Sequence, residues 1–466
     1  MKVALVYPFL LSGQSISAPL GLLYIASVLK KDHDIKIIDS TFSKSIEFIK
    51  KELIDFTPEV VGISSSSAMA EGAFKTAEIA KRIGSMVVLG GVHSTLFREE
   101  CIKNKNIDFV IPEEGEIPFK ELVAAFESVK SNGKELSQVG LVKGVLSKNH
   151  DFIPAEKIED LDVIPFPAWE LLPTREKYLN ASGGRLSIIA SRGCIFRCSY
   201  CQPTLKKIFG EKVRMRSPKN VVDEIEMDVK KFGAKSIAFQ DDTFTWNKEW
   251  LSEVCDLMKK KFNGKIPFRI NSRVNTIDEE KLIKLKKAGC SLISFGVESG
   301  SQRILDEILH KGIKTEQVIM AFNLAEKVGI RATAYIMLGN PTETKEDIEK
   351  TISLLEKINP FNIYLSVTNP LPHTDLYSIC EKMDILIPGA NKYYYRSFDS
   401  MPLRLKHLKE EDINKAKERI EKIARQKMIK HLIKDYARGV SHLKILSTVK
   451  LMREDFGSAI ALKKIL

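Results

Sequence analysis

The run SRGCIFRCSYC at residues 191–201 places Cys194, Cys198 and Cys201 in one short segment. Its Cys-x3-Cys-x2-Cys spacing supplies three thiolates and no fourth, whereas closed structural zinc or cluster sites use four ligands, commonly as two pairs far apart in sequence. A cubane cluster has four irons, so three protein ligands leave one iron open to bind another molecule. Two alternatives stay open at this point: a zinc knot completed by a distant ligand, and three buried cysteines that pack as small hydrophobic residues.

The cysteine run follows the first of six predicted strands that alternate with helices. These strands are predicted at Leu186–Ala190, Ser236–Gln240, Phe268–Asn271, Leu292–Val297, Arg331–Leu338 and Asn362–Val367. Six β/α repeats are fewer than the eight of a closed barrel, so we predict a partial, three-quarter (β/α)6 barrel of the TIM type, with its chemistry at the C-terminal strand ends. Polar groups follow all six strands: the cysteine run, Asp241-Asp242, Asn271 with Arg273, Glu298-Ser299, Asn340 with Glu343, and Thr368-Asn369.

An earlier alternating series occupies the first 145 residues. Its strands are predicted at Lys2–Tyr7, Asp34–Asp39, Val60–Ser64, Met86–Gly90 and Phe109–Ile111, with helical patterns at Leu20–Lys31, Glu71–Ile83 and Ile117–Val129. Short apolar strands separated by helices predict a doubly wound, Rossmann-like parallel sheet. Ligands of such sheets bind at the carboxyl ends of the strands, which here carry Ser64 to Ser67, Gly90-Gly91-Val92-His93 and Glu113-Glu114-Gly115-Glu116.

The barrel half resembles the core of radical S-adenosylmethionine (radical SAM) enzymes over roughly residues 185–370. The resemblance is carried by the cysteine run, with Gly193 and Tyr200, and by the runs FQDDTF, FGVESGS and IMLGNPTET. It implies that the three cysteines hold a 4Fe-4S cluster whose open iron binds S-adenosylmethionine. It further implies cofactor contacts from Asp241 or Asp242 to the methionyl amino group, Arg273 to the carboxylate, Glu298 and Ser299 to the ribose or amino group, and Gly339 to the adenine, with Tyr200 and Glu343 beside them. Each also has an ordinary interpretation: a helix cap for Asp241-Asp242, a surface salt bridge for Glu298 and a turn for Gly339.

The first half resembles the cobalamin-binding domains that precede some radical SAM cores. The matching runs are PLGLLYIASVL, GGVHSTLFREE and DFVIPEEGEIPFKEL. The resemblance implies cobalamin contacts from Ser64, Ser65, Gly90, Gly91, His93, Glu114, Gly115 and Glu116. The chain departs from the better known cobalamin modules because the Asp-x-His-x-x-Gly motif is absent after the first strand. A packing domain without cobalamin, with His93 as a hydrogen-bonded structural histidine, is the alternative.

The composition indicates the cellular compartment in which these domains are expected to function. The 466 residues are 44% hydrophobic, no apolar run reaches the length of a membrane span, and the N-terminus lacks the pattern of a signal peptide. Seven cysteines, three of them clustered, indicate a reducing cytoplasm. The scattered Cys101, Cys255, Cys290 and Cys380 have no metal-like spacing and are expected to be buried, with Cys380 as a candidate near the substrate mouth.

The net charge of +12 is concentrated at the C-terminus. Residues 401–466 carry 17 Lys/Arg against 8 Asp/Glu, and Ile413, Ala416, Ile420, Ile423, Ala424 and Tyr436 recur there at helical spacing. We therefore predict four parts: a Rossmann-like domain at 1–145, a proline-rich strap at 146–184, the barrel at 185–400 and a basic helical domain at 401–466. Tyr393, Tyr394 and Tyr395 either line a substrate pocket or cover the barrel bottom. The basic segment either contacts an anionic membrane surface, covers the substrate entrance or is a solvated helical face.

The two resemblances together imply a cobalamin-dependent radical SAM methyltransferase. A 5′-deoxyadenosyl radical would abstract hydrogen from an unactivated carbon, and methylcobalamin would deliver the methyl group. Three alternatives remain: a cyclase, rearrangement or carbon–carbon coupling enzyme with the same cofactors; a tRNA-modifying methylthiotransferase; and a non-catalytic iron–sulfur or zinc module. The expected partners are a small-molecule or lipid-like substrate, such as a tetrapyrrole with acidic groups, and an electron donor such as ferredoxin or flavodoxin. Residues 1–193 contain only Cys101 and so lack a second cysteine set, which argues against the methylthiotransferase and a nucleic-acid partner.

Overall fold

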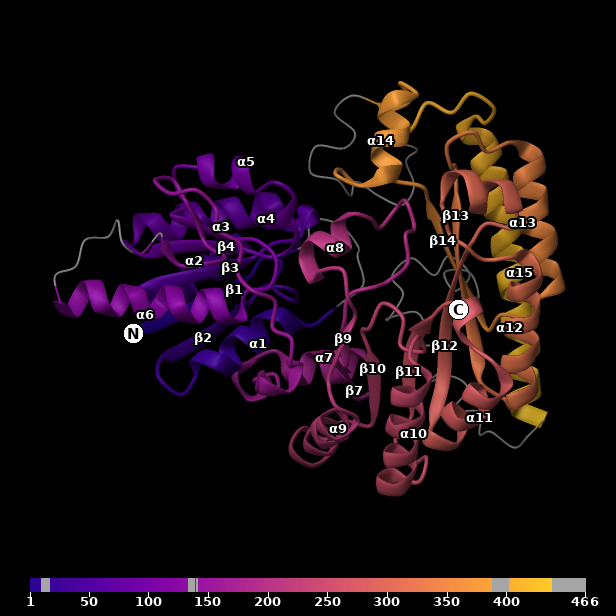
Figure 1. Ribbon diagram of the computed structural model, residues 1–466, viewed down its shortest axis with the longest axis horizontal. Coiled ribbons are helices and arrows are strands. Elements are labelled where there is room, and N and C mark those ends of the chain that lie inside the picture. The colour runs from indigo at the N-terminus through magenta and orange to yellow at the C-terminus, as the bar shows by residue number, and fades with distance from the viewer. Residues whose placement is uncertain (10–16, 133–138, 140, 388–401, 438–466) are drawn as a thin grey trace. The chain divides into compact units, whose positions relative to one another are not determined.

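The computed structural model describes residues 1–9, 17–132, 139, 141–387 and 402–437. Its described residues fall into two compact units (Figure 1). The first unit comprises residues 1–178 with 204–214, and the second comprises residues 179–203 with 215 onward. Each unit contains one main sheet, so each is considered by itself.

The first unit is built on a six-stranded sheet in the order β2-β1-β3-β4-β5-β6. All five predicted strands are confirmed and run parallel: β1 (Lys2–Tyr7), β2 (Asp34–Asp39), β3 (Val60–Ser64), β4 (Met86–Gly90) and β5 (Phe109–Ile111). The prediction of five strands was incomplete, because β6 (Leu146–Ser147) pairs antiparallel with β5 at the sheet edge. Two residues are too few to show a periodicity, so this strand left no sequence signal.

Helices connect these strands, as expected for a parallel sheet. They are α1 (Leu20–Leu29), α2 (Ile46–Phe56), α3 (Ala70–Arg82), α4 (Val92–Leu96), α5 (Arg98–Lys103) and α6 (Glu116–Asn132), with a 3-10 turn, η1 (Ser67–Met69), before α3. Small residues of α3 and aliphatic residues of α2 pack on the strands and bury Val61, Ile63, Val87 and Leu89. The short helix α4, which follows the carboxyl end of β4, also contacts β4 and β5.

The proline-rich segment packs on α1 of the first unit rather than forming a free linker. It contains two 3-10 turns, η3 (Leu161–Val163) and η4 (Trp169–Leu171). The Ala168 amide donates to the Leu23 carbonyl at 3.1 Å, and Ser27 Oγ donates to the Pro165 carbonyl at 3.2 Å. Trp169 is buried, which confirms that the apolar side chains of this segment need a surface to cover.

The second unit contains six parallel strands in the order β14-β13-β12-β11-β10-β7. They are β7 (Arg185–Ile188), β10 (Ser236–Phe239), β11 (Phe268–Ser272), β12 (Cys290–Glu298), β13 (Arg331–Leu338) and β14 (Asn362–Val367), within two residues of their predicted bounds. β7 and β14 lie at opposite edges and do not pair with each other in this order. The predicted partial (β/α)6 barrel is confirmed.

The long helices of the second unit run along the outside of its strands, whereas α14 is set apart from them and begins beside the cysteine loop (Figure 1). They are α9 (Pro218–Phe232), α10 (Lys248–Phe262), α11 (Glu279–Ala288), α12 (Thr315–Val328), α13 (Lys345–Lys357), α14 (Asp375–Lys382) and α15 (Glu410–Ala437). Shorter elements of this unit are β8 (Ser191–Arg192), η5 (Val274–Thr276) and η6 (Ile304–Ile308), whereas α8 (Thr204–Phe209) belongs to the first unit and α7 (Arg175–Ala181) and β9 (Arg214–Met215) span the division between the units. Ser217 caps α9 by accepting from the Asn220 amide, with Pro218 at the first helical position.

The C-terminal helix α15 packs on β14 and α13 within the second unit. Ile413, Ala416, Ile420, Ile423 and Ala424 are buried, whereas Tyr436 is 67% exposed. Residues 393–395 and 438–466 lie outside the described part of the chain. Among the described helices, none has an apolar stretch long enough to cross a membrane.

Candidate active site

The cysteine run leaves β7 as a loop that is held by hydrogen bonds to distant segments. Ser199 donates through its amide to the Leu309 carbonyl at 2.9 Å and through Oγ to the Ile308 carbonyl at 2.6 Å. The Ser199 carbonyl accepts from the Leu376 amide at 2.9 Å, and Gln202 Nε2 donates to the Phe196 carbonyl at 3.0 Å. The loop is therefore fixed at the C-terminal ends of the strands, as barrel chemistry requires.

The thiols of this loop have two kinds of polar neighbour. Arg273, after β11, donates from Nη1 to Cys198 Sγ at 3.1 Å and lies over the Phe196 ring, 3.8 Å from its centroid. Cys194 Sγ lies 4.0 Å from Thr243 Oγ1. Burial raises the pKa of Cys201 to about 12, with the neighbouring Cys198 adding to the shift. A thiol of this kind stays protonated until a cation replaces its proton.

Glu298, at the end of β12, lies in a buried polar triad. Lys311 Nζ donates to Glu298 Oε1 at 2.9 Å and to the Tyr200 hydroxyl at 2.6 Å, and that hydroxyl lies 3.1 Å from the same carboxylate oxygen. Only 7% of Glu298 and 5% of Lys311 are exposed. The salt bridge of Glu298 is thus buried and not on the surface. Its partner, Lys311, was not among the residues that the sequence analysis identified.

The two consecutive aspartates after β10 have different surroundings. Asp241 is buried and accepts hydrogen bonds from the Ala190 amide at 3.2 Å and from the Ser191 hydroxyl, so it ties the end of β7 to β10. Burial raises the pKa of Asp241 to about 6, against the lowering effect of these hydrogen bonds. Asp242 is exposed. Of the two carboxylates, Asp242 is the one open to an ammonium group.

The run after β13 forms a compact turn. Glu343 accepts from the Gly339 amide at 2.6 Å and the Asn340 amide at 3.1 Å, and burial raises its pKa to about 7. Gly339 has φ +79, while a Cβ there would meet neighbouring side chains only at ordinary distances of 3.6 Å or more. The glycine is therefore explained by its left-handed backbone rather than by close approach. Ser299 is fully buried and accepts from the Ser301 amide at 3.1 Å.

The predicted cobalamin contacts of the first unit gather at the ends of β3 and β4. Ser65 donates its amide to the Gly90 carbonyl and accepts from the His93 amide, both at 2.9 Å. Gly91 has φ +95, and a Cβ there would lie 2.7 Å from the Ser65 carbonyl oxygen, so strand packing alone requires glycine. His93 is fully buried, its Nδ1 is 3.2 Å from Ser67 Oγ, and burial lowers its pKa to about 4. These features match the structural interpretation of His93, while Ser64 remains partly exposed.

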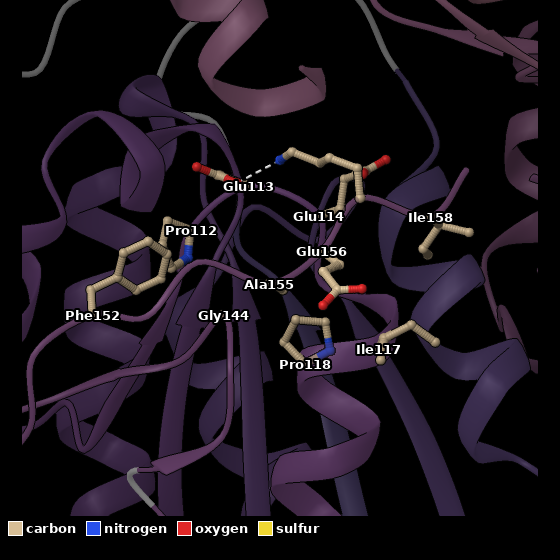
Figure 2. Close-up of a pocket in the computed structure, with 11 residues that line it drawn as sticks. Pro112, Glu113, Glu114, Ile117, Pro118, Gly144, Phe152, Ala155, Glu156 and Ile158 are labelled. Carbon is tan, nitrogen blue, oxygen red and sulfur yellow. Dashed lines mark hydrogen bonds and ion pairs between the residues drawn. The ribbon is translucent and has the colours of Figure 1, made fainter. Parts of the chain in front are cut away.

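A pocket lies at the carboxyl end of β5 (Figure 2). It encloses ≈ 310 Å³, part of it open to solvent. Glu114, at its edge, pairs with the buried Arg214 at 3.0 Å, and Glu113 pairs with Lys157. Of the predicted cobalamin residues only Glu114 lines this pocket; Gly115 and Glu116 follow it at the start of α6. The lining residues are Pro112, Glu113, Glu114, Ile117, Pro118, Gly144, Phe152, Ala155, Glu156, Lys157 and Ile158.

The loop chemistry fits a cluster better than it fits zinc. Arg273 donates to a loop sulfur, and an N–H donor to a ligand sulfur is a recognised means of tuning iron–sulfur sites. Among the described residues no three His, Cys, Asp or Glu side chains already form a metal-binding group. The role of the three thiols as cluster ligands stays a prediction.

Each half of the chain matches a known protein family. Residues 188–355 match the model of the radical SAM superfamily, and residues 9–123 match the B12 binding domain. The chain is 36% identical to uncharacterized methyltransferase PH0819 of Pyrococcus horikoshii, covering 89% of this chain and 90% of the relative. It is 31% identical to the anaerobic magnesium-protoporphyrin IX monomethyl ester cyclase of Rubrivivax gelatinosus, covering 81% of this chain and 69% of the relative.

A solved structure supports the same architecture. The radical S-adenosylmethionine methyltransferase TsrM of Kitasatospora setae superposes with a TM-score of 0.67 at 18% identity, covering 82% of this chain and 76% of that one. The family matches confirm the predicted enzyme class and cofactor set: a 4Fe-4S cluster, S-adenosylmethionine and cobalamin. The chain belongs to the radical SAM superfamily, in the branch whose members also carry a B12-binding domain.

Proposed function

We propose that this enzyme methylates an unactivated carbon of a bulky, largely apolar molecule that carries acidic groups. The observation that carries the proposal is the cysteine loop at the mouth of an open six-stranded barrel, in a chain that also contains a B12-binding domain. The relative PH0819, called a methyltransferase, aligns over 90% of its length. When bound, the cluster and S-adenosylmethionine supply radical chemistry and cobalamin supplies a methyl group.

The side chains at the mouth divide the work of binding. The exposed carboxylate of Asp242 is suited to the ammonium of S-adenosylmethionine. It can accept a charge-assisted hydrogen bond from that ammonium without giving up a hydrogen bond within the protein. Asp241 instead fixes the end of β7, from which the cysteine loop departs. Glu298 and Arg273 are held by Lys311 and Cys198, so they act from fixed positions.

The open face of the barrel favours a planar apolar substrate. Ala334 and Ile336 of β13 are buried in the core, so Tyr335 points to the opposite face, where it is 37% exposed. It stacks on Tyr364 of β14 with ring centroids 4.9 Å apart and planes 19° apart. A stacked pair with one accessible ring offers a flat surface to a conjugated molecule. The cyclase relative acts, by its name, on a tetrapyrrole ester.

Product mass distinguishes methylation from its rival. With S-adenosylmethionine deuterated in its methyl group, the reconstituted enzyme is expected to add one labelled methyl group to the substrate. Cyclisation, which the cyclase relative favours, would remove two hydrogens and leave the product unlabelled. Magnesium-porphyrin esters and fatty acids are suitable first substrates, and an unlabelled product would replace the methyl-transfer proposal with cyclisation.

We further propose that α15 contacts anionic membrane surfaces, in addition to an electron donor of the ferredoxin or flavodoxin class. Ile429, Ile433 and Tyr436 are 45%, 64% and 67% exposed at helical spacing near its end, within a segment of 17 Lys/Arg and 8 Asp/Glu. Each basic residue near such a surface contributes about 1 kcal/mol. Sedimentation with phosphatidylserine vesicles should therefore exceed that with neutral vesicles, fall at high salt, and weaken in Ile433→Asp but not in Ile54→Asp on α2, where Ile54 is 47% exposed. Equal binding to both vesicle types would exclude this contact.

A further inference from the structure

Lys311 is a buried lysine that no ligand role explains. Its side chain is 5% exposed and reaches the Tyr200 hydroxyl at 2.6 Å and Glu298 Oε1 at 2.9 Å. Removing an ammonium from water is costly, so a lysine in this place must be compensated by nearby groups. One compensating group is Glu298, and the other neighbours belong to the cysteine loop.

The backbone around Lys311 is also joined to the cysteine loop. Arg273 Nη2 donates to the Lys311 carbonyl, while Arg273 Nη1 donates to Cys198 Sγ at 3.1 Å. Tyr200, whose hydroxyl accepts a hydrogen bond from the Lys311 ammonium, directly precedes Cys201. Two buried cations thus flank the segment between Cys198 and Cys201, one in contact with a ligand sulfur and one beside the next cysteine.

The sheet is shaped to hold the ammonium in this position. A Cβ at Gly296 on β12 would lie 2.6 Å from both Lys311 Nζ and Glu298 Oε1, so a larger residue there would displace the two charged groups from their present positions. Glu298 itself has φ +67, a strained value for a residue with a side chain. The ammonium also lies closer to the cysteine loop than the carboxylate does, because Lys311 Nζ is 2.6 Å from the Tyr200 hydroxyl whereas Glu298 Oε1 is 3.1 Å from it. The net influence of the pair on the loop is therefore positive.

We propose that Lys311, together with Arg273, is a positioning residue that raises the reduction potential of the cluster held by Cys194, Cys198 and Cys201. Reduction from the 2+ to the 1+ state adds one electron and no proton, and a fixed positive charge in a low-dielectric surrounding stabilises the more negative state. An N–H donor to a ligand sulfur acts in the same direction. The enzyme can then accept an electron from a weaker external donor than an unassisted loop would need.

The inference rests on the cluster's assignment to this loop, and its test does not depend on methyl transfer. The full-length protein, reconstituted anaerobically without S-adenosylmethionine or substrate, is titrated with reduced viologen dyes while the 1+ signal is followed by electron paramagnetic resonance. Lys311→Met should make one-electron reduction at least tenfold less favourable, where each factor of ten corresponds to about 59 mV. Lys311→Arg keeps the charge and should stay near the wild-type value.

Two further variants separate the charge effect from a packing effect. Glu298→Gln removes a negative charge from the same pair and should shift the potential in the opposite direction, even if Lys311→Met fails to fold. Lys314→Met is the matched control, since Lys314 pairs with Asp306 in solvent with 62% of its side chain exposed, and it should leave the potential unchanged. Equal potentials in wild type and Lys311→Met at equal iron content, or a lowered potential in Glu298→Gln, would overturn the proposal. Retention of the cluster in Cys198→Ala would instead remove the loop assignment on which it rests.

Discussion

Cys198→Ala protein is expected to lose both cluster assembly and S-adenosylmethionine cleavage. Two thiolates remain in the loop, one fewer than the three that the cluster assignment requires. Iron and sulfide content, absorbance after anaerobic reconstitution and 5′-deoxyadenosine release are the measurements. The fold should survive, because Ser199 and Gln202 still hold the loop when Cys198 loses its hydrogen bond from Arg273.

Cys255→Ala is the matched control for this variant. Cys255 on α10 is also buried, at 3% exposure, and lies outside the loop. Its replacement should cost packing energy but leave the cluster content and the cleavage rate unchanged. A Cys198→Ala protein that still releases 5′-deoxyadenosine would contradict the assignment of the cluster to this loop.

Arg216→Met is expected to lower the free energy of unfolding by about 3–5 kcal/mol, the range for removing one partner of a buried ion pair. Arg216 Nη1 pairs with Glu224, and both Glu224 and Asp228 on α9 are fully buried. Burial raises the pKa of Glu224, and it raises that of Asp228 well above its usual range, with Glu224 adding to the second shift. Neither carboxylate oxygen of Asp228 has a hydrogen-bond partner among the described residues. Arg216 is thus the cation that lets two buried acids share one helix face.

Urea unfolding of full-length protein, followed by circular dichroism, measures this effect. Arg419→Met provides the comparison, because Arg419 pairs with Glu349 on the surface with 51% of its side chain exposed. An exposed pair contributes at most about 1 kcal/mol. The double variant Arg216→Met, Glu224→Met should recover much of the loss, since a buried pair replaced by apolar groups is often neutral. Similar losses for Arg216→Met and Arg419→Met would show that Glu224 is compensated by another group.

The positions of the parallel strands were predictable from sequence because each is a short, largely apolar run that a helical pattern separates from the next. β13 (Arg331–Leu338) and β14 (Asn362–Val367) begin and end as predicted. The environment of each site residue was not predictable. Asp241 and Asp242 are adjacent residues of the same type. Only the position of Ser191 in the structure shows that the Asp241 carboxylate already accepts a hydrogen bond within the protein.

Lys311 shows the same limit more clearly. A lysine after a helical turn usually extends into solvent, and no local pattern marks this one as buried. Its place depends on Gly296 and Glu298 of β12 and on Tyr200, which is 111 residues distant in sequence. The signal that could have located it is the glycine before Glu298, in a strand where a larger residue would otherwise be expected.

The hydrogen bonds of Ser199 also determine when the cysteine loop can take shape during synthesis. Its partners are Ile308, Leu309 and Leu376, so the last of them leaves the ribosome about 175 residues after the loop itself. At about 5–20 residues per second that delay is roughly 9–35 s. Throughout that interval the three thiols lack their final neighbours. Insertion of iron and sulfide into a finished loop therefore has to follow the synthesis of α14, and oxygen present before then meets unprotected cysteines.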